Sequence, residues 1–196
     1  MKLIILDRDG VINQDSDAFI KSPDEWVAIK GSLEAIARLN QAGYRVVVAT
    51  NQSGIARGLF DIQDLNAIHQ KMHAAAQIVG AEIDAVFFCP HAADDHCDCR
   101  KPKPGMFHDI ARRFEINLRN HVAGVPVVGD SLRDLQAGFV AGCTPHLVLT
   151  GKGEKTLEKG GLPPGTTVYP NLAAVVDALL KKPVDHTTVI PAKAGI

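Results

Sequence analysis

The sequence predicts an α/β fold in which helices cover both faces of a mostly parallel sheet. Short apolar runs rich in β-branched residues alternate with amphipathic stretches of helical length along most of the 196 residues. Several apolar runs end abruptly in polar residues, and the carboxyl ends of strands are where open α/β sheets bind their ligands. We therefore expect a Rossmann-like, doubly wound parallel sheet.

Composition narrows the classes of partner. The chain is 46% hydrophobic and carries a formal net charge of −1, so it lacks the basic excess of nucleic-acid-binding proteins. No apolar run approaches the roughly 20 residues that span a bilayer. Only about five apolar residues precede Asp7, too few for the core of a signal peptide. We expect one cytoplasmic domain without a nucleic-acid or membrane partner.

The first two predicted strands flank a helix. Residues 2–6 form an apolar run that stops at Asp7 and predict the first strand. A polar loop leads to a helix that begins near Ser32, a good N-cap residue, and ends at Gly43. The β-branched run at residues 44–49 predicts the second strand.

A long helix and an irregular loop follow. Asp61 can cap a helix that runs to about Val79, whose apolar residues lie three or four positions apart and mark a buried stripe. Residues 83–88 predict the third strand. Residues 89–105 are rich in Cys, His, Pro and Lys and show no periodicity, so they predict a loop.

The rest of the chain repeats the alternation of strand and helix. The predicted elements are a helix at about 106–114, strand 125–128, a helix ending near 140, strand 146–149, a loop at 151–165, strand 167–169 and helix 172–180. Residues 182–196 lack a pattern and predict a mobile tail. We therefore expect the folded domain to span residues 1–181.

Acidic residues follow the first predicted strand. Asp7 and Asp9 are two positions apart, so in an extended segment their side chains point the same way. Two convergent carboxylates suit Mg²⁺, and a carboxylate can also attack a phosphoryl group. An Asp-Gly turn with two solvated acids would show the same local pattern. Polar clusters at the ends of two further strands favour a shared site at one edge of the sheet.

These further clusters carry complementary chemistry. Thr50 offers a hydroxyl, and the turn at residues 51–54 offers backbone N–H groups to phosphate oxygens, although polar loops of this kind are common. Asp130 adds a third carboxylate for Mg²⁺, or it caps the next helix together with Ser131. The basic run at residues 100–105 could neutralise a phosphoryl group, or it could be a solvated loop.

Cysteines and histidines cluster in the irregular loop. Three of the four cysteines lie within eleven residues, and in a reducing cytosol such clustering indicates metal binding before disulfides. A Cys₃His set suits tetrahedral structural Zn²⁺, with free surface thiols as the alternative. The candidate ligands are Cys89, His91, Cys97 and Cys99, with His96 as a rival. Cys143 is expected to be a small buried apolar residue.

Four motifs in order resemble the haloacid dehalogenase phosphatase superfamily over about residues 1–180. They are DRDG at 7–10, Thr50-Asn51, Lys101-Pro102 and Gly129-Asp130. Within it, the runs LDRDGVIN, TNQSGIARG, CPH…CDCRKPKPGM and GDSLRDLQAG are most similar to the heptose-bisphosphate phosphatases, and histidinol-phosphate phosphatases share most of them. The resemblance implies the haloacid dehalogenase fold. Because no long insert is present, we expect no large cap domain.

The resemblance assigns roles to individual residues. Asp7 would be the nucleophile, and Asp9 the acid/base, whose pKa should therefore lie nearer neutrality than that of a free Asp. Mg²⁺ would be held by Asp7, the backbone carbonyl of Asp9 and Asp130, while Thr50 and Lys101 would steady the phosphoryl group. The implied substrate-binding residues are Asp15, Ser16, Asp17, Ala18, Thr50, Asn51, Gln52, Ser53, Arg100, Lys101 and Ser131.

The resemblance also favours one zinc ligand set. His91 matches the family position better than His96 does, which implies Zn²⁺ on Cys89, His91, Cys97 and Cys99. The loop has few hydrophobic residues of its own, so metal ligation is expected to order it. It ends directly in Arg100 and Lys101, and we expect it to hold both over the active site.

The implied reaction is hydrolysis of the 7-phosphate of a heptose 1,7-bisphosphate in ADP-heptose and lipopolysaccharide core precursor synthesis, with the anomer left open. Histidinol-phosphate hydrolysis is the alternative. A zinc-binding module without catalysis would require a broken catalytic set, and the set is complete. Near-neutral charge argues against a nucleic-acid 3′-phosphatase. We expect a monomer that acts on a small sugar phosphate.

Overall fold

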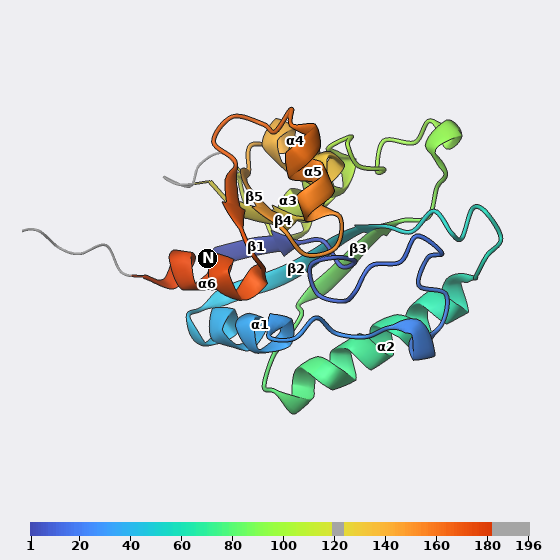
Figure 1. The fold of residues 1–196 in the computed structure, drawn as a ribbon, viewed down its shortest axis with the longest axis horizontal. Helices are drawn as coiled ribbons and strands as arrows, with labels where there is room; N and C mark the ends of the chain where they lie inside the picture. The colour runs from blue at the N-terminus through green and yellow to red at the C-terminus, as the bar shows by residue number, and fades with distance from the viewer. Residues whose placement is uncertain (119–123, 182–196) are drawn as a thin grey trace, which may run out of the picture.

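The computed structural model describes residues 1–118 and 124–181, which form a three-layer α/β fold around one parallel sheet (Figure 1). The strands are β1 (Lys2–Leu6), β2 (Tyr44–Asn51), β3 (Ala85–Cys89), β4 (Pro126–Gly129), β5 (Thr144–Val148) and β6 (Thr167–Tyr169). Their order is β3-β2-β1-β4-β5-β6. The predicted doubly wound sheet is confirmed.

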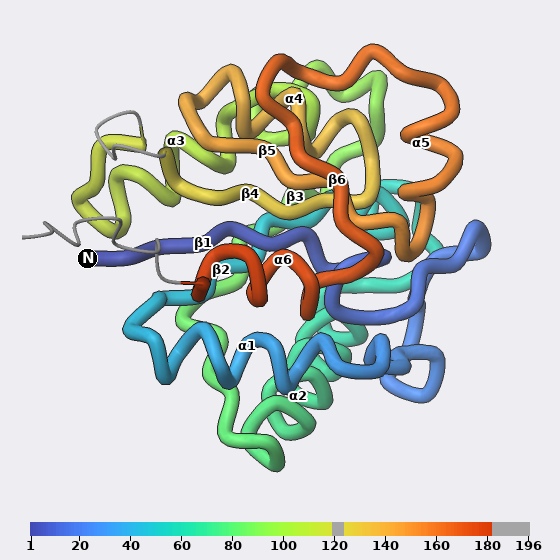
Figure 2. Tube along the Cα trace, turned by 60° about the vertical axis from the view of Figure 1, so that its left-hand side comes forward, coloured from blue at the N-terminus to red at the C-terminus, as the bar shows by residue number. Residues whose placement is uncertain are grey.

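Helices cover both faces of the sheet. They are α1 (Ser32–Gln41), α2 (Ile62–Ile78), α3 (Gly105–Arg113), α4 (Leu132–Ala141), α5 (Gly153–Lys159) and α6 (Leu172–Leu180), with 3₁₀ turns η1 (Pro23–Glu25) and η2 (Ala93–Asp95). Figures 1 and 2 show α1, α2 and α6 on one side of the sheet and α3, α4 and α5 on the other.

Alternation along β1 explains the two cores. Ile4 and Leu6 face the core under α1, α2 and α6, whereas Leu3 and Ile5 face the core under α3 and α4. All four side chains are almost completely buried, as expected for a central strand covered on both faces. β1 pairs with β2 on one side and β4 on the other, so the strand order reverses beside it. This reversal is where doubly wound sheets bind ligands.

The predicted loop at residues 151–165 is wrong in its first half, because α5 occupies it. This helix is short, and only Gly153 and Thr156 are buried, so it has no apolar stripe that would predict a helix. Tertiary contacts explain its position. A Cβ on Gly153 would lie 1.8 Å from the Val148 carbonyl oxygen, and the Thr156 hydroxyl donates to the Asp130 carbonyl oxygen at 2.8 Å.

Smaller differences affect element ends. The predicted N-cap at Ser32 is wrong: the cap is Gly31, with φ of 85°, and the Ser32 hydroxyl donates to the buried Val11 carbonyl oxygen at 2.8 Å. β2 continues to Asn51, two residues beyond the prediction, because it pairs with β3 as far as Cys89. The Asp61 cap of α2 is confirmed, with a capping box to Asp64.

The predicted tail at 182–196 lies outside the described residues. Among the residues that are described, no helix is long and apolar enough to cross a membrane.

Candidate active site

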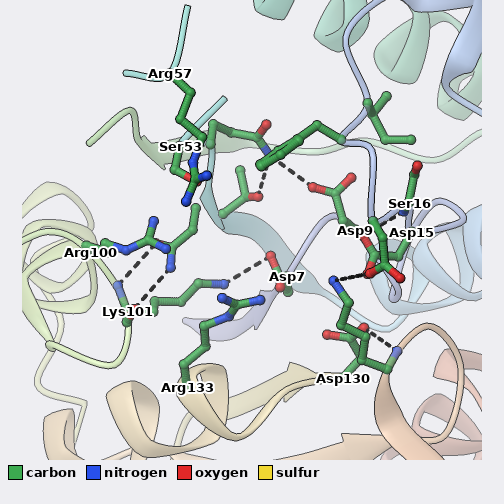
Figure 3. A pocket seen from close by; sticks show the side chains of 17 residues that line it. Asp7, Asp9, Asp15, Ser16, Ser53, Arg57, Arg100, Lys101, Asp130 and Arg133 are labelled. Atoms are coloured by element: carbon green, nitrogen blue, oxygen red, sulfur yellow. Dashed lines mark hydrogen bonds and ion pairs between the residues drawn. The ribbon is translucent and has the colours of Figure 1, made fainter. Parts of the chain in front are cut away.

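Asp7 follows β1 and lines a pocket at the carboxyl edge of the sheet (Figure 3). Its Oδ1 accepts the backbone N–H of Arg8 at 2.8 Å and lies 3.0 Å from Nζ of Lys101. Burial and the nearby Asp134 carboxylate raise the pKa of Asp7 to about 7, although Lys101 acts in the opposite direction. Among the described residues both contacts fall on Oδ1, so the other oxygen of Asp7 is available for a metal ion or a phosphorus atom.

The ammonium group of Lys101 is buried beside Asp7. Its Nζ donates to the Ala49 carbonyl oxygen at 2.7 Å and lies 2.6 Å from Oδ1 of Asp134. Burial alone would lower the pKa of Lys101, but the Asp134 and Asp7 carboxylates outweigh it and raise the pKa. Lys101 is therefore a fixed positive charge at the point where a phosphoryl group would meet Asp7.

Sequence reasoning assigned no role to Asp134, which the structure places against Lys101. Its Oδ2 accepts the backbone N–H and the hydroxyl of Ser131 at 3.0 and 2.6 Å, so both carboxylate oxygens are engaged. Burial would raise the pKa of Asp134, but Lys101 and Ser131 outweigh it and lower the pKa. The S-x-x-D spacing of a helix capping box is the sequence signal that could have identified this residue.

Asp130 is held in a narrow space between two glycines. Cβ atoms added to Gly10 and Gly151 would lie 2.1 and 2.2 Å from its Oδ2. The same oxygen accepts the backbone N–H of Lys152 at 2.7 Å. Burial, together with the negative charges of Asp134 and Asp7, raises the pKa of Asp130 to about 8.

The donor set fits a hard cation. Oxygens of Asp7, Asp130 and Asp134 all lie within 4.8 Å of one another. Because Asp134 is engaged by Lys101 and Ser131, Asp7 and Asp130 are the pair that fits Mg²⁺, which is commonly held by one or two carboxylates. Burial and the neighbouring negative charges raise both pKa values, and a divalent cation would offset those charges. The predicted Mg²⁺ site is therefore supported by its donor chemistry.

Asp9 points away from this pair. Nε and Nη2 of Arg8 donate to its carboxylate at 3.0–3.2 Å, and Asn13 and Gln52 add side-chain N–H donors at 2.9 and 3.0 Å. Burial would raise the pKa of Asp9, but Arg8, Asn13 and Gln52 outweigh it and lower the pKa. The expectation of a pKa nearer neutrality is therefore wrong for this structure. Any contribution of Asp9 to metal binding rests on its backbone carbonyl.

The end of β2 joins this site to the basic loop. The Asn51 side chain donates to the Lys101 carbonyl oxygen at 3.0 Å and accepts its backbone N–H at 3.1 Å. The Gln52 side chain donates to the Thr50 hydroxyl at 2.8 Å as well as to Asp9. These bonds hold the polar end of β2 between Asp9 and Lys101.

The pocket encloses about 220 Å³ and gathers most of the predicted site residues. Those that line it are Asp7, Asp9, Asp15, Ser16, Asp17, Thr50, Asn51, Gln52, Ser53, Arg100, Lys101 and Asp130. Ala18 and Ser131 lie outside this lining. Three more cationic residues line the pocket, Arg57, Arg133 and Lys152, and none of them was predicted individually as a site residue. Figure 3 shows Arg57, Arg100, Lys101 and Arg133 together on one side of the pocket, an arrangement suited to a polyanion.

The predicted zinc ligands also meet. Sγ atoms of Cys89, Cys97 and Cys99 lie 3.0–3.6 Å apart, and Nδ1 of His91 lies 3.3 and 3.5 Å from two of them. Two thiolates on a tetrahedral zinc ion would lie about 3.8 Å apart. His96 is exposed and outside this cluster. The cluster therefore fits a Cys₃His zinc site.

The cluster is connected to the pocket by backbone contacts. Nη1 of Arg100 donates to the His91 carbonyl oxygen at 3.2 Å. The Arg100 side chain, which also lines the pocket, is thus held by the loop that carries the metal ligands. The backbone N–H of Gln52 donates to the Cys89 carbonyl oxygen at 2.7 Å. The conformation of the loop therefore affects two residues that line the pocket, Arg100 and Gln52.

Comparison with known proteins agrees with this geometry. A D-glycero-beta-D-manno-heptose-1,7-bisphosphate 7-phosphatase from Bordetella bronchiseptica is 66% identical over 182 residues, covering 93% of this chain and 99% of the relative. The enzyme of the same description from Neisseria meningitidis serogroup B is 56% identical over 174 residues, covering 88% of this chain and 91% of the relative. The chain belongs to this phosphatase family. The resemblance to a branch of the haloacid dehalogenase superfamily is confirmed.

Structures of heptose-bisphosphate phosphatases share the fold. The crystal structure of the D,D-heptose 1,7-bisphosphate phosphatase from B. bronchiseptica, complexed with magnesium and phosphate, matches with a TM-score of 0.89 and 67% identity, covering 92% of this chain and 98% of that one. The enzyme from Burkholderia thailandensis matches with a TM-score of 0.74 and 60% identity, covering 93% and 100%. Residues 2–137 also match the family model described as polynucleotide kinase 3 phosphatase.

Proposed function

We propose that this chain hydrolyses the 7-phosphate of D-glycero-β-D-manno-heptose 1,7-bisphosphate, a step in ADP-heptose and lipopolysaccharide core precursor synthesis. The observation that carries the proposal is 66% identity over nearly the full length of the B. bronchiseptica phosphatase. The pocket supports it, because Asp7, Lys101 and Asp130 converge where a phosphoryl group can react. The relatives from B. bronchiseptica and N. meningitidis are phosphatases of the β-anomeric heptose bisphosphate, which favours the β anomer here.

The reaction has two phosphoryl transfers. In the first, an oxygen of Asp7 forms a bond to phosphorus, the bond from phosphorus to the sugar oxygen breaks, and Asp9 gives its proton to that oxygen. In the second, water attacks phosphorus, Asp9 takes a proton from the water, and the bond to Asp7 breaks. Lys101 and Thr50 hold the phosphoryl oxygens. Mg²⁺ on Asp7 and Asp130, when bound, neutralises charge on the phosphoryl group.

The state of Asp9 fits the second transfer directly. Arg8, Asn13 and Gln52 stabilise the ionised carboxylate, which is the form that accepts a proton from water. A bound phosphate ester adds negative charge to the pocket, and nearby negative charge raises the pKa of a carboxylate. This shift is in the direction that the first transfer needs, because Asp9 gives a proton in that step.

The remaining assignments follow from this role. Residues 1–181 would act as one phosphatase domain, with Zn²⁺ in a structural site and Arg100 contacting the sugar phosphate. We infer a cytoplasmic enzyme, because its substrate is a small, charged biosynthetic intermediate. We expect a monomer without a nucleic-acid partner.

A phosphate-release panel tests the proposal. The purified protein with Mg²⁺ should release phosphate from the β anomer of the heptose bisphosphate at least tenfold faster than from the α anomer or from histidinol phosphate. Preference for histidinol phosphate would contradict the substrate assignment. Asp7→Asn should abolish turnover on every ester and leave the circular dichroism spectrum unchanged, and unchanged kcat in that variant would refute the nucleophile.

A further inference from the structure

Arg8 is buried at least as deeply as Lys101, and Asp9 does not use all of its hydrogen-bond donors. The Arg8 side chain has no solvent exposure. Nε and Nη2 of Arg8 donate to the Asp9 carboxylate, whereas Nη1 lies 3.3 Å from Nε2 of His69. A guanidinium group is planar and its donors are fixed relative to one another. Anchoring Nη1 therefore fixes the plane in which Arg8 presents its other nitrogens to Asp9.

The contact defines the state of His69. A guanidinium group can only donate hydrogen bonds, so Nε2 of His69 must be the acceptor and the ring must be neutral with its proton on Nδ1. The surroundings agree, since burial and the Arg8 charge lower the pKa of His69 to about 4. A neutral acceptor satisfies Nη1 without competing with Asp9 for the charge of Arg8.

His69 is itself held in place. It lies on α2 four residues after Leu65 and three before Met72, both fully buried, so it shares their side of the helix. Its ring packs edge-on against Phe88 of β3, with ring centroids 6.5 Å apart. The capping box at Asp61 fixes the start of the helix. α2, which lies beneath the sheet in Figure 1, thus holds the His69 ring against β3.

We propose that His69 is a positioning residue, which acts through Arg8 to orient the Asp9 carboxylate for proton transfer. This inference rests on the proposed function, because it needs Asp9 to act as the acid/base. Without the acceptor, Arg8 can rotate, and the Asp9 carboxylate loses the geometry in which it reaches the leaving oxygen. His69 does not line the pocket, so it is not expected to affect substrate affinity.

The test compares variants that keep or remove the acceptor. His69→Gln supplies a side-chain oxygen in place of Nε2, whereas His69→Leu removes it. His69→Phe keeps a ring beside Phe88 and replaces the Leu variant if that protein fails to fold. His108→Leu, at an exposed position on α3, is the matched control.

The measurement is kcat/KM on two esters, because kcat/KM reports the steps up to formation of the aspartyl-phosphate. A sugar alkoxide needs a proton to leave and p-nitrophenolate does not. We expect His69→Leu to lower kcat/KM on the heptose bisphosphate about tenfold, part of the 10²–10⁴-fold that a general acid supplies, and on p-nitrophenyl phosphate less than threefold. KM should stay within twofold, and His69→Gln should recover most of the loss.

Two results would overturn the inference. They are an unchanged kcat/KM in His69→Leu, and an equal loss on both esters that His69→Gln does not rescue. A wrong substrate assignment would give a different result from a wrong role for His69, because the wild-type protein itself would then be inactive on the heptose bisphosphate. In that case the same comparison is made on the sugar phosphate that the wild type accepts.

Discussion

Two carboxylates, Asp7 and Asp134, pair with the positive charge of Lys101, but they differ in how many of their oxygens make contacts. Asp134 has both oxygens occupied, by Lys101 and by Ser131, whereas both contacts of Asp7 fall on one oxygen. Asp134 is therefore suited to hold Lys101, and Asp7 to react. Asp130 has a different environment again, since it packs against Gly10 and Gly151 and has no contact with Lys101 among those that the described residues make.

This difference predicts distinct effects of two Asp→Asn substitutions. Asp130→Asn removes a metal-ligand candidate and should weaken the apparent Mg²⁺ affinity by about tenfold or more. Asp134→Asn should lower kcat about 10- to 100-fold, because Lys101 loses its anchor, while Mg²⁺ affinity falls much less. Activity titrated with Mg²⁺ measures both quantities. Asp24→Asn, on exposed η1, is the control, and equal loss of Mg²⁺ affinity in both variants would assign Asp134 to the metal.

At the scale of elements, the loop between β3 and α3 links two sites. It carries the Cys₃His cluster and then Arg100 and Lys101, but these two basic residues are held differently. Arg100 contacts the loop itself through the His91 carbonyl oxygen. Lys101 is held from outside the loop by Asn51, Asp7 and Asp134. Loss of metal should therefore disturb Arg100 more than Lys101.

Removal of one thiolate tests this separation. Cys97→Ser should lose zinc and raise KM for the sugar phosphate roughly tenfold, with a smaller change in kcat and a core that stays folded. Metal analysis, steady-state kinetics and thermal unfolding measure the three effects. Cys143→Ala, at the cysteine outside the cluster, should keep zinc and KM. A zinc-free Cys97→Ser protein with normal kinetics would contradict the role of the loop.

At the scale of the whole molecule, the strand order brings the end of β1 between β2 and β4 and so assembles the site from distant segments. The last two strands of the sheet, β5 and β6, contain a buried group that is unrelated to catalysis. His146 of β5 hydrogen bonds to Thr167 of β6 at 2.5 Å and packs beside Tyr169. Burial lowers the pKa of His146 to about 4 from its usual 6.5.

This shift predicts a pH dependence of stability. Below pH 6.5 the unfolded chain protonates His146 and the folded chain does not, so its neutral form favours folding fully above pH 6.5 and progressively less toward pH 4. Between pH 6.5 and 5 the loss is roughly 1.5 kcal/mol, because the slope approaches about 1.4 kcal/mol per pH unit only below pH 6.5. Urea unfolding of the wild type and His146→Gln at both pH values measures the contribution of His146 to this loss of stability. A shallower decline in the variant is expected, and identical declines would show that His146 is not held neutral.

The sequence by itself determined the alternation of strands and helices, the strand-end motifs and the cluster of cysteines and histidines in the irregular loop, because apolar period and short residue spacings are local properties. Tertiary structure decided which side chains meet. Asp134 and Arg8 received their roles from partners 33 and 61 residues away along the chain, Lys101 and His69. The same packing lowered the pKa of Asp9, and contacts with Asp130 and Val148 formed α5 where no apolar stripe predicts a helix. Burial and long-range ion pairing depend on how the chain folds back on itself, and no local pattern records them.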